Sequence, residues 1–316
     1  MATRLTVAEL ASPTGRDRQS TLVAMTPDAA DTTPDSFASE VLTIETEGHV
    51  ATLWLDRPKQ LNALGPDFWT DLPRAMDALG AAMDIRVVII AARGPHFSVG
   101  LDLKAVSAPG GLLAGGGGDA SVPAPSMATR GRRARTEILR LQASITSVAA
   151  CPKPVIAAIH GYCIGGGVDL AAACDIRVAS ADASFSVRET RLAMVADLGS
   201  LQRLPGIIGK GHVSELAYTG KDITAERAAR IGLVNDLAPD VEGVLALAHE
   251  LAAAIAANSP LAVQGTKAVL TAGEDRSVAE GLDYVATWNA AALSSDDLTE
   301  AMVAFMEKRP AQFTGR

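Results

Sequence analysis

Cysteine is scarce in this sequence. The 316 residues include only Cys151, Cys163 and Cys174, and no two of them form a CxxC pair. An odd number of cysteines without such a pair argues against a disulfide framework and against a cysteine-based zinc site. We therefore expect reduced, buried and inert thiols, and we predict a cytoplasmic protein.

Long apolar runs and an excess of basic charge are also lacking. No stretch approaches about 18 consecutive apolar residues, and the N-terminus has no short apolar core of a signal peptide, so we expect neither membrane insertion nor export. The 36 acidic and 28 basic residues give a net charge of −8. A polyphosphate would be repelled over most of such a surface, so nucleic acid is a poor partner.

The familiar motifs of metal-dependent and serine catalysis are absent as well. The sequence has no GxSxG, no HExxH and no EF-hand loop, and its five histidines have no ligand spacing. His160 is interpreted as a satisfied core residue rather than a base. We expect chemistry that needs neither a metal nor a cofactor.

Strand and helix patterns alternate through most of the chain. Residues 41–55 alternate apolar and polar around Glu47 and Gly48, which predicts a β-hairpin. Residues 85–92 and 154–161 are short apolar runs typical of strands buried on both faces. Helical spacing follows each strand region, over 66–83 and from about 132 to 150. This order predicts an α/β fold.

The chain divides into three parts by pattern. Residues 1–38 lack sustained periodicity and are predicted to be a flexible extension; the alternative of a transit peptide is opposed by scattered acids. Residues 39–240 are predicted to form the α/β core. Residues 241–316 have helical periods throughout and are predicted to form a C-terminal helical region.

One segment interrupts the alternation of strand and helix patterns. Residues 109–131 are rich in Gly, Pro and Ser, which predicts a long mobile loop that is either an ordinary insertion or a cover over a site. Arginines gather just beyond it. These arginines are Arg130, Arg132, Arg133, Arg135 and Arg140. They could lie on a solvated helix face, or they could contact a phosphate of a ligand.

A glycine-rich turn lies between a buried strand and a helix. In residues 161–169, GYCIGGGVD, three consecutive glycines leave backbone N–H groups free at a helix N-terminus, where negative charge is favoured. The spacing fits neither a Walker loop nor GxGxxG, so an oxyanion formed during reaction is a candidate ligand. The alternative is that the glycines permit close packing of strand and helix. A second turn, residues 94–103, follows another buried strand and could face the same pocket, or Gly100 could be a turn residue only.

Three acids occur in largely apolar surroundings. Asp169 follows the glycines, Glu189 lies in SVRETRL, and Asp197 lies in MVADLGS. Each also has a structural explanation. Asp169 could complement a helix dipole, Glu189 could be a surface loop residue, and Asp197 could be the N-cap of a helix beginning at Leu198.

Taken together, these segments resemble the crotonase (enoyl-CoA hydratase/isomerase) superfamily. The resemblance implies an α/β spiral of ββα units, with a C-terminal helical region that mediates trimers and commonly hexamers. It also implies an acyl-CoA thioester substrate. The segments that carry the resemblance run from about Glu40 to the C-terminus and include LDRPKQLNAL (55–64), FSVGLDL (97–103), PKPVIAAIHGYCIGGGVDLAAACDIRVAS (152–180), GLVND (232–236) and SPLAVQGTK (259–267).

Within the superfamily the chain is most similar to the dienoyl-CoA isomerases, through GYCIGGGVDL, ADLGSLQRLP and DYVATWN. That resemblance implies an oxyanion hole from the N–H groups of Leu101 and Gly166. A CoA site would be lined by Val99, Gly100, Leu101, Asp102 and Leu103. Apart from the resemblance, Lys267 or Lys308 in the C-terminal region is a candidate to reach CoA phosphates.

The same resemblance assigns the acids. Asp197 is the expected base at C2 of a 3,5-dienoyl-CoA, Glu189 the donor at C6, and Asp169 the neighbour that keeps Glu189 protonated. Two alternatives stay open. One is an enoyl-CoA hydratase, which would hold a water between two carboxyls; the other is an acyl-CoA-binding protein without turnover.

Overall fold

The computed structural model describes residues 34–108 and 126–316. Residues 1–33 and 109–125 lie outside the described residues. Most of the predicted N-terminal extension and most of the predicted long loop, residues 109–131, fall there.

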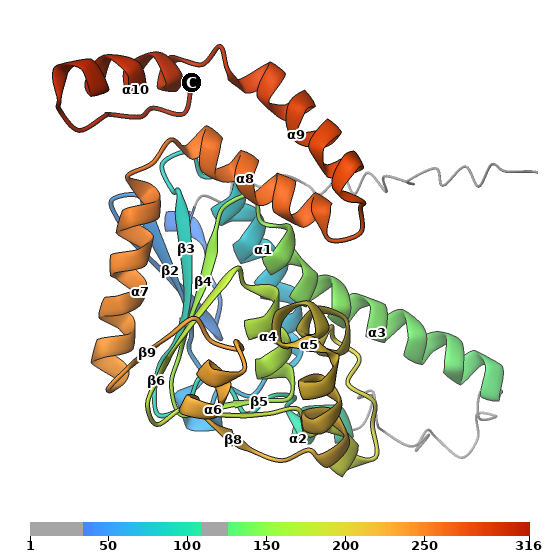
Figure 1. Ribbon diagram of the computed structural model, residues 1–316. Helices are drawn as coiled ribbons and strands as arrows, with labels where there is room; N and C mark the ends of the chain where they lie inside the picture. Colours follow the sequence, from blue (N-terminus) through green and yellow to red (C-terminus); the bar gives the residue numbers. More distant parts are fainter. Residues whose placement is uncertain (1–33, 109–125) are drawn as a thin grey trace, which may run out of the picture. The chain divides into compact units, whose positions relative to one another are not determined.

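A six-stranded sheet lies at the centre of the fold (Figure 1). Its first two strands pair antiparallel as the predicted hairpin, and each later strand runs parallel to its neighbour. The third and fourth strands are apolar and buried at every residue, as expected for a sheet covered on both faces. In spatial order the strands are β1 (Leu42–Glu47), β2 (Val50–Leu55), β3 (Val87–Ala92), β4 (Val155–Ile159), β6 (Ile176–Ser180) and β9 (Asp236–Ala238).

Helices cover the two faces of this sheet. On one face, α7 (Val241–Ala256) packs against β3, β4 and β6 through small buried side chains such as Ala248 and Ala252. The larger core on the other face includes buried residues of α1 (Pro66–Ala81), α3 (Met127–Ala150) and α4 (Gly166–Ala173). The other described helices are α2 (Leu103–Ser107), α5 (Ser200–Thr219), α6 (Ala225–Arg230), α8 (Pro260–Gly273), α9 (Val278–Ala292) and α10 (Asp296–Glu307), with short 3-10 turns η1 (Pro34–Ser36), η2 (Pro58–Gln60) and η3 (Glu189–Leu192).

A second, three-stranded sheet begins inside the glycine-rich turn. It consists of β5 (Tyr162–Ile164), β7 (Ser184–Ser186) and β8 (Ile223–Thr224). Strands β5 and β7 pair parallel, and β7 and β8 pair antiparallel. The sequence predicted only a turn at this place. The strands were missed because two or three residues are too few to show a period and because their partners are distant in the chain.

Helix α3 begins earlier than predicted, at Met127 rather than near Arg132. The Ser126 hydroxyl caps it by accepting a hydrogen bond from the N–H of Thr129 at 3.2 Å. The Gly, Pro and Ser residues just before it are typical of loops, so the sequence pattern placed the start of the helix too late. Arg130, which the predicted loop included, therefore lies in α3 with the other four arginines, and all five are exposed, as expected for a solvated helix face.

The described chain after β9 is helical from Val241 to Glu307, apart from short connections (Figure 1). Within residues 34–108 and 126–316, no single helix has the length and apolar composition of a membrane span. Helices α7 and α8 reach that composition only together, across a bend of 107°.

A buried lysine joins α1 to the segment before β4. Lys153 is 3% exposed, and its ammonium donates to the carbonyl of Leu79 at 2.5 Å and to that of Ala82. These carbonyls lie at the C-terminal end of α1, where a positive charge is favoured.

Replacing Lys153 by Met is expected to destabilise the fold by about 1–3 kcal/mol, because two carbonyls at the end of α1 lose their donor. The measurement is the free energy of unfolding in urea. Lys210→Met, an exposed position on α5, is the matched control. Equal stability of the two variants would contradict the capping role of Lys153.

Candidate active site

Two turns from separate parts of the chain meet beside the start of α4. The turn after β3 pairs with β5 through a bridge between Ser98 and Cys163, and the N–H of Ile164 donates to the carbonyl of Ser98 at 3.0 Å. On its other side this turn pairs with residue 64 through a bridge between Leu64 and Leu101. The two turns, residues 94–103 and 161–169, therefore lie against each other.

Close contact at this point requires glycine. Gly100 has φ +84°, and a Cβ on it would lie 2.6 Å from the carbonyl oxygen of Ile164 and 3.1 Å from the nitrogen of Gly166. Both of these atoms are backbone atoms and cannot rotate away. The reading of Gly100 as a turn residue only is thus incomplete, because its missing side chain also lets the two turns touch.

The meeting brings two free amides together. No hydrogen bond joins the N–H of Leu101 or the N–H of Gly166 to another described residue. A Cβ on Gly166 would lie 3.7 Å from the nitrogen of Leu101, so the two N–H groups lie close to each other. Gly166 is also the first residue of α4, where unpaired N–H groups favour negative charge. Paired amides of this kind can hold an oxyanion.

Glu189 lies beside Gly165, the residue before Gly166. It begins η3, it is half-buried, and a Cβ on Gly165 would lie 3.1 Å from its Oε1. Its Oε2 is buried with no hydrogen-bond partner among the described residues. Burial raises the pKa of Glu189, and the negative charge of Asp197 raises it further. The reading of Glu189 as a simple surface residue is wrong.

Asp197 lies in the loop before α5. It is exposed, and its backbone carbonyl accepts a hydrogen bond from the Gln142 side chain at 2.6 Å. Partial desolvation raises the pKa of its carboxyl. The N-cap of α5 is Gly199 and the helix begins at Ser200, so the alternative in which Asp197 caps a helix from Leu198 is wrong.

Asp169 is the most buried of the three acids, at 1% exposure. Its Oδ1 accepts a hydrogen bond from the N–H of Ser200 at 2.6 Å. Burial raises the pKa of Asp169 to about 7; the charges of Glu189 and Asp197 add to the rise, and the Ser200 contacts oppose it. The charges of Glu189 and Asp197 thus act on Asp169, and Asp169 accepts a hydrogen bond from the first residue of α5 besides lying in the first turn of its own helix.

The predicted CoA-site residues surround Leu101. Asp102 caps α2, accepting from the N–H of Ala105 at 3.1 Å, and it pairs with Arg57 at 3.2 Å. Val99 is half-buried and Leu103 is 44% exposed. Sequence reasoning missed Arg57, although it lies in the segment 55–64 that carried the resemblance.

Lys267 does not point to a surface ligand. It is 8% exposed, and its ammonium donates to the carbonyl of Lys153 at 3.0 Å and to Asp175 at 2.7 Å. The expectation that it reaches a CoA phosphate is wrong, because its three-donor head group is already engaged inside the fold.

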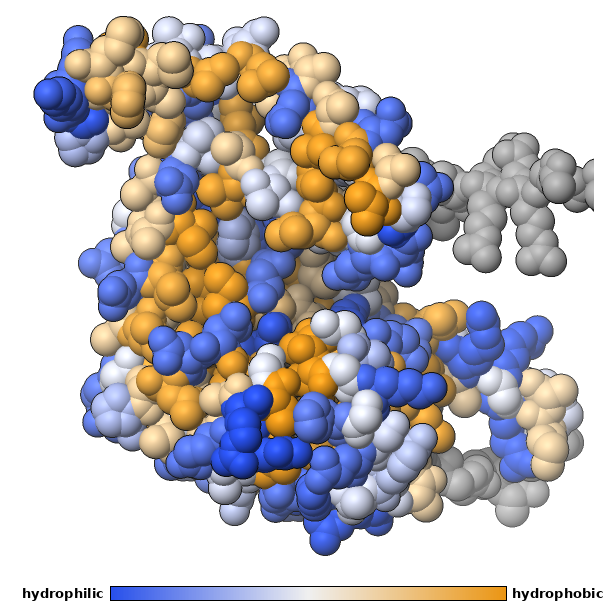
Figure 2. All heavy atoms as spheres, viewed as in Figure 1, coloured by the Kyte–Doolittle hydropathy of each residue, from blue (hydrophilic) through white to orange (hydrophobic). Residues whose placement is uncertain are grey.

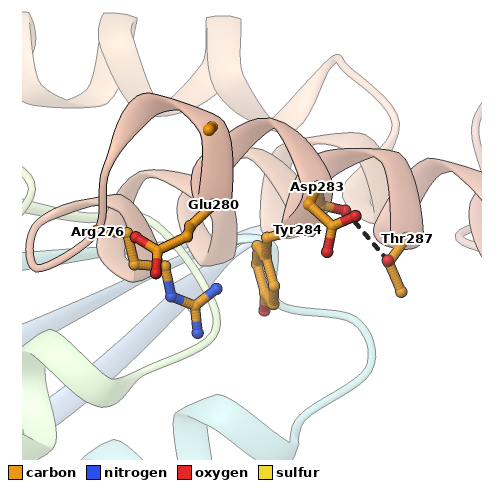
Figure 3. A pocket seen from close by; sticks show the side chains of 6 residues that line it. Arg276, Glu280, Asp283, Tyr284 and Thr287 are labelled. Carbon is orange, nitrogen blue, oxygen red and sulfur yellow. Dashed lines mark hydrogen bonds between the residues drawn. The ribbon is translucent and has the colours of Figure 1, made fainter.

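A separate hollow of about 560 Å³ lies on the flank of α9 (Figure 3). Arg276 stands over the Tyr284 ring, 4.7 Å from its centroid, and Thr287 donates to the backbone carbonyl of Asp283 at 3.1 Å. None of the predicted site residues lines it. Among all the described residues, no three His, Cys, Asp or Glu side chains are grouped so that they could hold a metal ion.

Comparisons with known proteins point to one family. The profile of the enoyl-CoA hydratase/isomerase family matches residues 45–111 and 117–316. The Delta(3,5)-Delta(2,4)-dienoyl-CoA isomerase, peroxisomal, of Arabidopsis thaliana is 45% identical over 277 residues, covering 87% of this chain and 96% of the relative. The mitochondrial isomerase of the same name from Dictyostelium discoideum is 46% identical over 264 residues, covering 84% of this chain and 87% of the relative.

These names overturn the predicted compartment. The relatives are named as peroxisomal or mitochondrial enzymes, so the cytoplasmic prediction is wrong. The three cysteines are free and buried. Cysteines buried in the core stay unpaired whatever the compartment. Free cysteines therefore do not distinguish the cytoplasm from a peroxisome or a mitochondrion.

The fold agrees with the family. An enoyl-CoA hydratase structure from Bacillus anthracis superimposes with a TM-score of 0.78 at 31% identity, covering 88% of this chain and all of that one. The predicted fold class, an α/β crotonase-like spiral with C-terminal helices, is confirmed. By its sequence profile, its relatives and its fold, the chain belongs to the enoyl-CoA hydratase/isomerase family.

Proposed function

We propose that this chain is an isomerase that converts 3,5-dienoyl-CoA to 2,4-dienoyl-CoA. The observation that carries the proposal is the coupled cluster of Asp169, Glu189 and Asp197 beside the free amides of Leu101 and Gly166. The relatives named for this reaction, at 39–46% identity, support it.

The amides stabilise the charge that the reaction creates. Loss of a proton from C2 of a thioester gives a dienolate, whose negative charge lies largely on the thioester oxygen. Two fixed N–H donors at that oxygen lower the barrier most when no protein group already occupies them, as is the case for Leu101 and Gly166 among the described residues. Val99, Gly100, Asp102 and Leu103 would line the bound CoA beside them.

The acids move the proton. The isomerisation removes a proton at C2 and adds one at C6, four bonds away, and one carboxyl with a reach of roughly 3 Å cannot easily serve both ends. Asp197, exposed and able to exchange its proton with water, is the base at C2. Glu189, half-buried and with its pKa raised, is the donor at C6. The net change is a shift of one proton and two double bonds, so no metal or redox cofactor is required.

The contacts of Asp169 favour this reaction over hydration. A hydratase would need a second carboxyl free to grip a water with Glu189. Asp169 instead accepts a 2.6 Å hydrogen bond from α5 and is almost fully buried. Burial and the charge of Asp197 raise the pKa of Glu189, which favours the protonated form of that donor.

The test is an ultraviolet assay of the purified protein with a 3,5-dienoyl-CoA, in which we expect the absorbance of the conjugated 2,4-diene to appear. Crotonyl-CoA is the parallel substrate for hydration. Hydrated product without diene formation would assign the chain as a hydratase. Tight binding of both thioesters, with no exchange of the C2 hydrogen in deuterated water, would assign a binding protein.

We also propose that the chain assembles as a homotrimer, or as a hexamer of two trimers, through its C-terminal helices. Helix α9 has no buried residue within the described chain, although it carries several apolar side chains. Figure 2 shows apolar residues gathered over α8 and α9. The exposed apolar residues of α8 to α10 include Leu270, Val278, Leu282, Leu293, Met302, Phe305 and Met306. Exposed apolar residues that gather on neighbouring helices often mark a surface where subunits meet.

Replacing Phe305, which is 82% exposed, by Glu is expected to shift the mass from trimer or hexamer toward monomer, because a charge would be buried in the interface. Light scattering after gel filtration measures the mass. Met83→Glu, at an 87% exposed position outside these helices, is the control. A wild-type protein that is monomeric at micromolar concentration contradicts the assembly.

A further inference from the structure

A neighbouring segment sets the direction of the Leu101 amide. The carbonyl of Gly100 accepts a hydrogen bond from the N–H of Leu64 at 2.8 Å, and the N–H of Asp102 donates to the carbonyl of Leu64 at 3.0 Å. A peptide unit is planar and trans, so its C=O and N–H point in opposite directions. Because Leu64 holds the carbonyl of the peptide between Gly100 and Leu101, the N–H of that peptide points away from the backbone of Leu64.

The segment that holds this turn contains a buried asparagine. Asn62 is 2% exposed, and its Nδ2 donates to the carbonyl of Arg93 at 2.9 Å and to that of His96 at 2.8 Å, where the chain leaves β3 and enters the turn. Its Oδ1 accepts a hydrogen bond from the N–H of Arg57 at 2.8 Å. Both donors and the oxygen of the amide are therefore engaged. One side chain thus ties the start of the turn to the segment that fixes its end.

A second path of hydrogen bonds joins Asn62 to the residue before Leu101. The hydroxyl of Ser98, which is fully buried, donates to the backbone carbonyl of Asn62 at 2.8 Å. The same hydroxyl accepts a hydrogen bond from the N–H of Gly100 at 3.1 Å. Asn62 therefore acts on the turn through its side chain at the start and through Ser98 near the Leu101 amide.

Two explanations of Asn62 have to be separated. Its φ is +53°, in the left-handed region that asparagine tolerates better than most residues and that glycine adopts without strain. On the first explanation, the position needs asparagine for its backbone conformation only. On the second, it needs the amide, because the amide supplies hydrogen bonds that place the turn. The complete use and the burial of the amide favour the second explanation.

We propose that Asn62 is a positioning residue whose amide keeps the Leu101 N–H directed at the thioester oxygen of the bound substrate. The inference rests on the proposed function for the identity of that substrate. Asn62 acts through the turn and not by contact with the reacting atoms. Without its amide, the carbonyls of Arg93 and His96 lose their donor and the turn shifts. A displacement of about 1 Å in an active site can cost on the order of 10²-fold in rate.

The first experiment measures kcat and KM for a 3,5-dienoyl-CoA in wild type, Asn62→Gly and Asn62→Asp. Glycine suits the positive φ but has no amide, and aspartate keeps the size of the side chain but replaces its two donors by an oxygen. For both variants we expect kcat to fall by about 10–10²-fold. The fall in kcat should exceed the rise in KM, because the amide holds the charged dienolate more strongly than the substrate. A wild-type kcat in Asn62→Gly would show a backbone role only and would overturn the inference.

Lys153→Met is the matched control. Lys153 is also buried and also donates to two backbone carbonyls, but it precedes β4, whereas the glycine-rich turn follows that strand. Assayed below the melting temperature of every variant, Lys153→Met should keep the wild-type kcat. Equal losses of kcat in Lys153→Met and Asn62→Gly would show that lowered stability alone accounts for both, and would overturn the inference.

A second readout does not depend on turnover. The probe is octanoyl-CoA labelled with ¹³C at the thioester carbonyl, whose stretching band in the infrared moves to lower frequency when N–H groups donate to its oxygen. Wild type and Lys153→Met should show the full shift on binding, and Asn62→Gly a smaller one. An equal shift in Asn62→Gly, or no shift in wild type, overturns the inference. If wild type shifts the band but does not isomerise a 3,5-dienoyl-CoA, the proposed function fails, and the band still decides the role of Asn62.

Discussion

Replacing Asp197 by Asn lowers kcat for the isomerisation of a 3,5-dienoyl-CoA by about 10²–10⁴-fold, the range expected when a general base is removed. The amide keeps the size and polarity of the side chain but cannot accept the C2 proton. Because Asp197 is exposed and its neighbour contacts run through its backbone carbonyl, the fold should be little affected. Diene absorbance measures the rate, and circular dichroism checks the fold.

Hydrogen exchange separates the roles of the two catalytic acids. In deuterated water, Asp197→Asn should lose exchange at C2 together with isomerisation. Glu189→Gln should lose isomerisation but keep exchange at C2, since Asp197 can still remove the proton and pass it to solvent. Asp77→Asn, exposed on α1, is the control for loss of a negative charge. Undiminished isomerisation in Asp197→Asn rejects the assignment of the base.

The parts of the fold that sequence reasoning predicted are those fixed by local pattern. The hairpin over 41–55 and the buried strands β3 and β4 follow from alternation and from short β-branched runs, which need no knowledge of distant partners. The sequence could also predict that the two turns lie near each other, because loops at the carboxyl ends of parallel strands share one edge of a sheet. It could not predict which atoms of the turns touch.

What sequence reasoning missed depends on contacts between distant residues. Strands β5, β7 and β8 each have three residues or fewer and exist only through their pairing. The hydrogen bond from Ser200 to Asp169 joins residues 31 positions apart, and no local signal indicates it. Asp197 is not a helix cap because α5 begins at Ser200, with Gly199 as its N-cap. Roles for the acids came from the family resemblance, and their electrostatic coupling required the structure.

Replacing Gly100 by Ala is expected to lower kcat by about 10²–10³-fold, as when one donor of an oxyanion hole is lost. The added Cβ would lie 2.6 Å from the carbonyl oxygen of Ile164, so the turn that carries Leu101 has to move away from β5 and α4. The two amides then no longer point at one oxygen. Positive φ adds strain, with a stability cost of about 1–3 kcal/mol.

The matched control for this change is Gly206→Ala on α5, where no atom lies within 4 Å of the added Cβ and φ is not positive. Thermal unfolding separates a loss of folded protein from a loss of catalysis, and assays are run well below the melting temperature of Gly100→Ala. Exchange of the C2 hydrogen should fall in parallel with isomerisation, because both pass through the dienolate that the amides stabilise. A folded Gly100→Ala that exchanges C2 at the wild-type rate would mean that the thioester oxygen binds elsewhere than between Leu101 and Gly166.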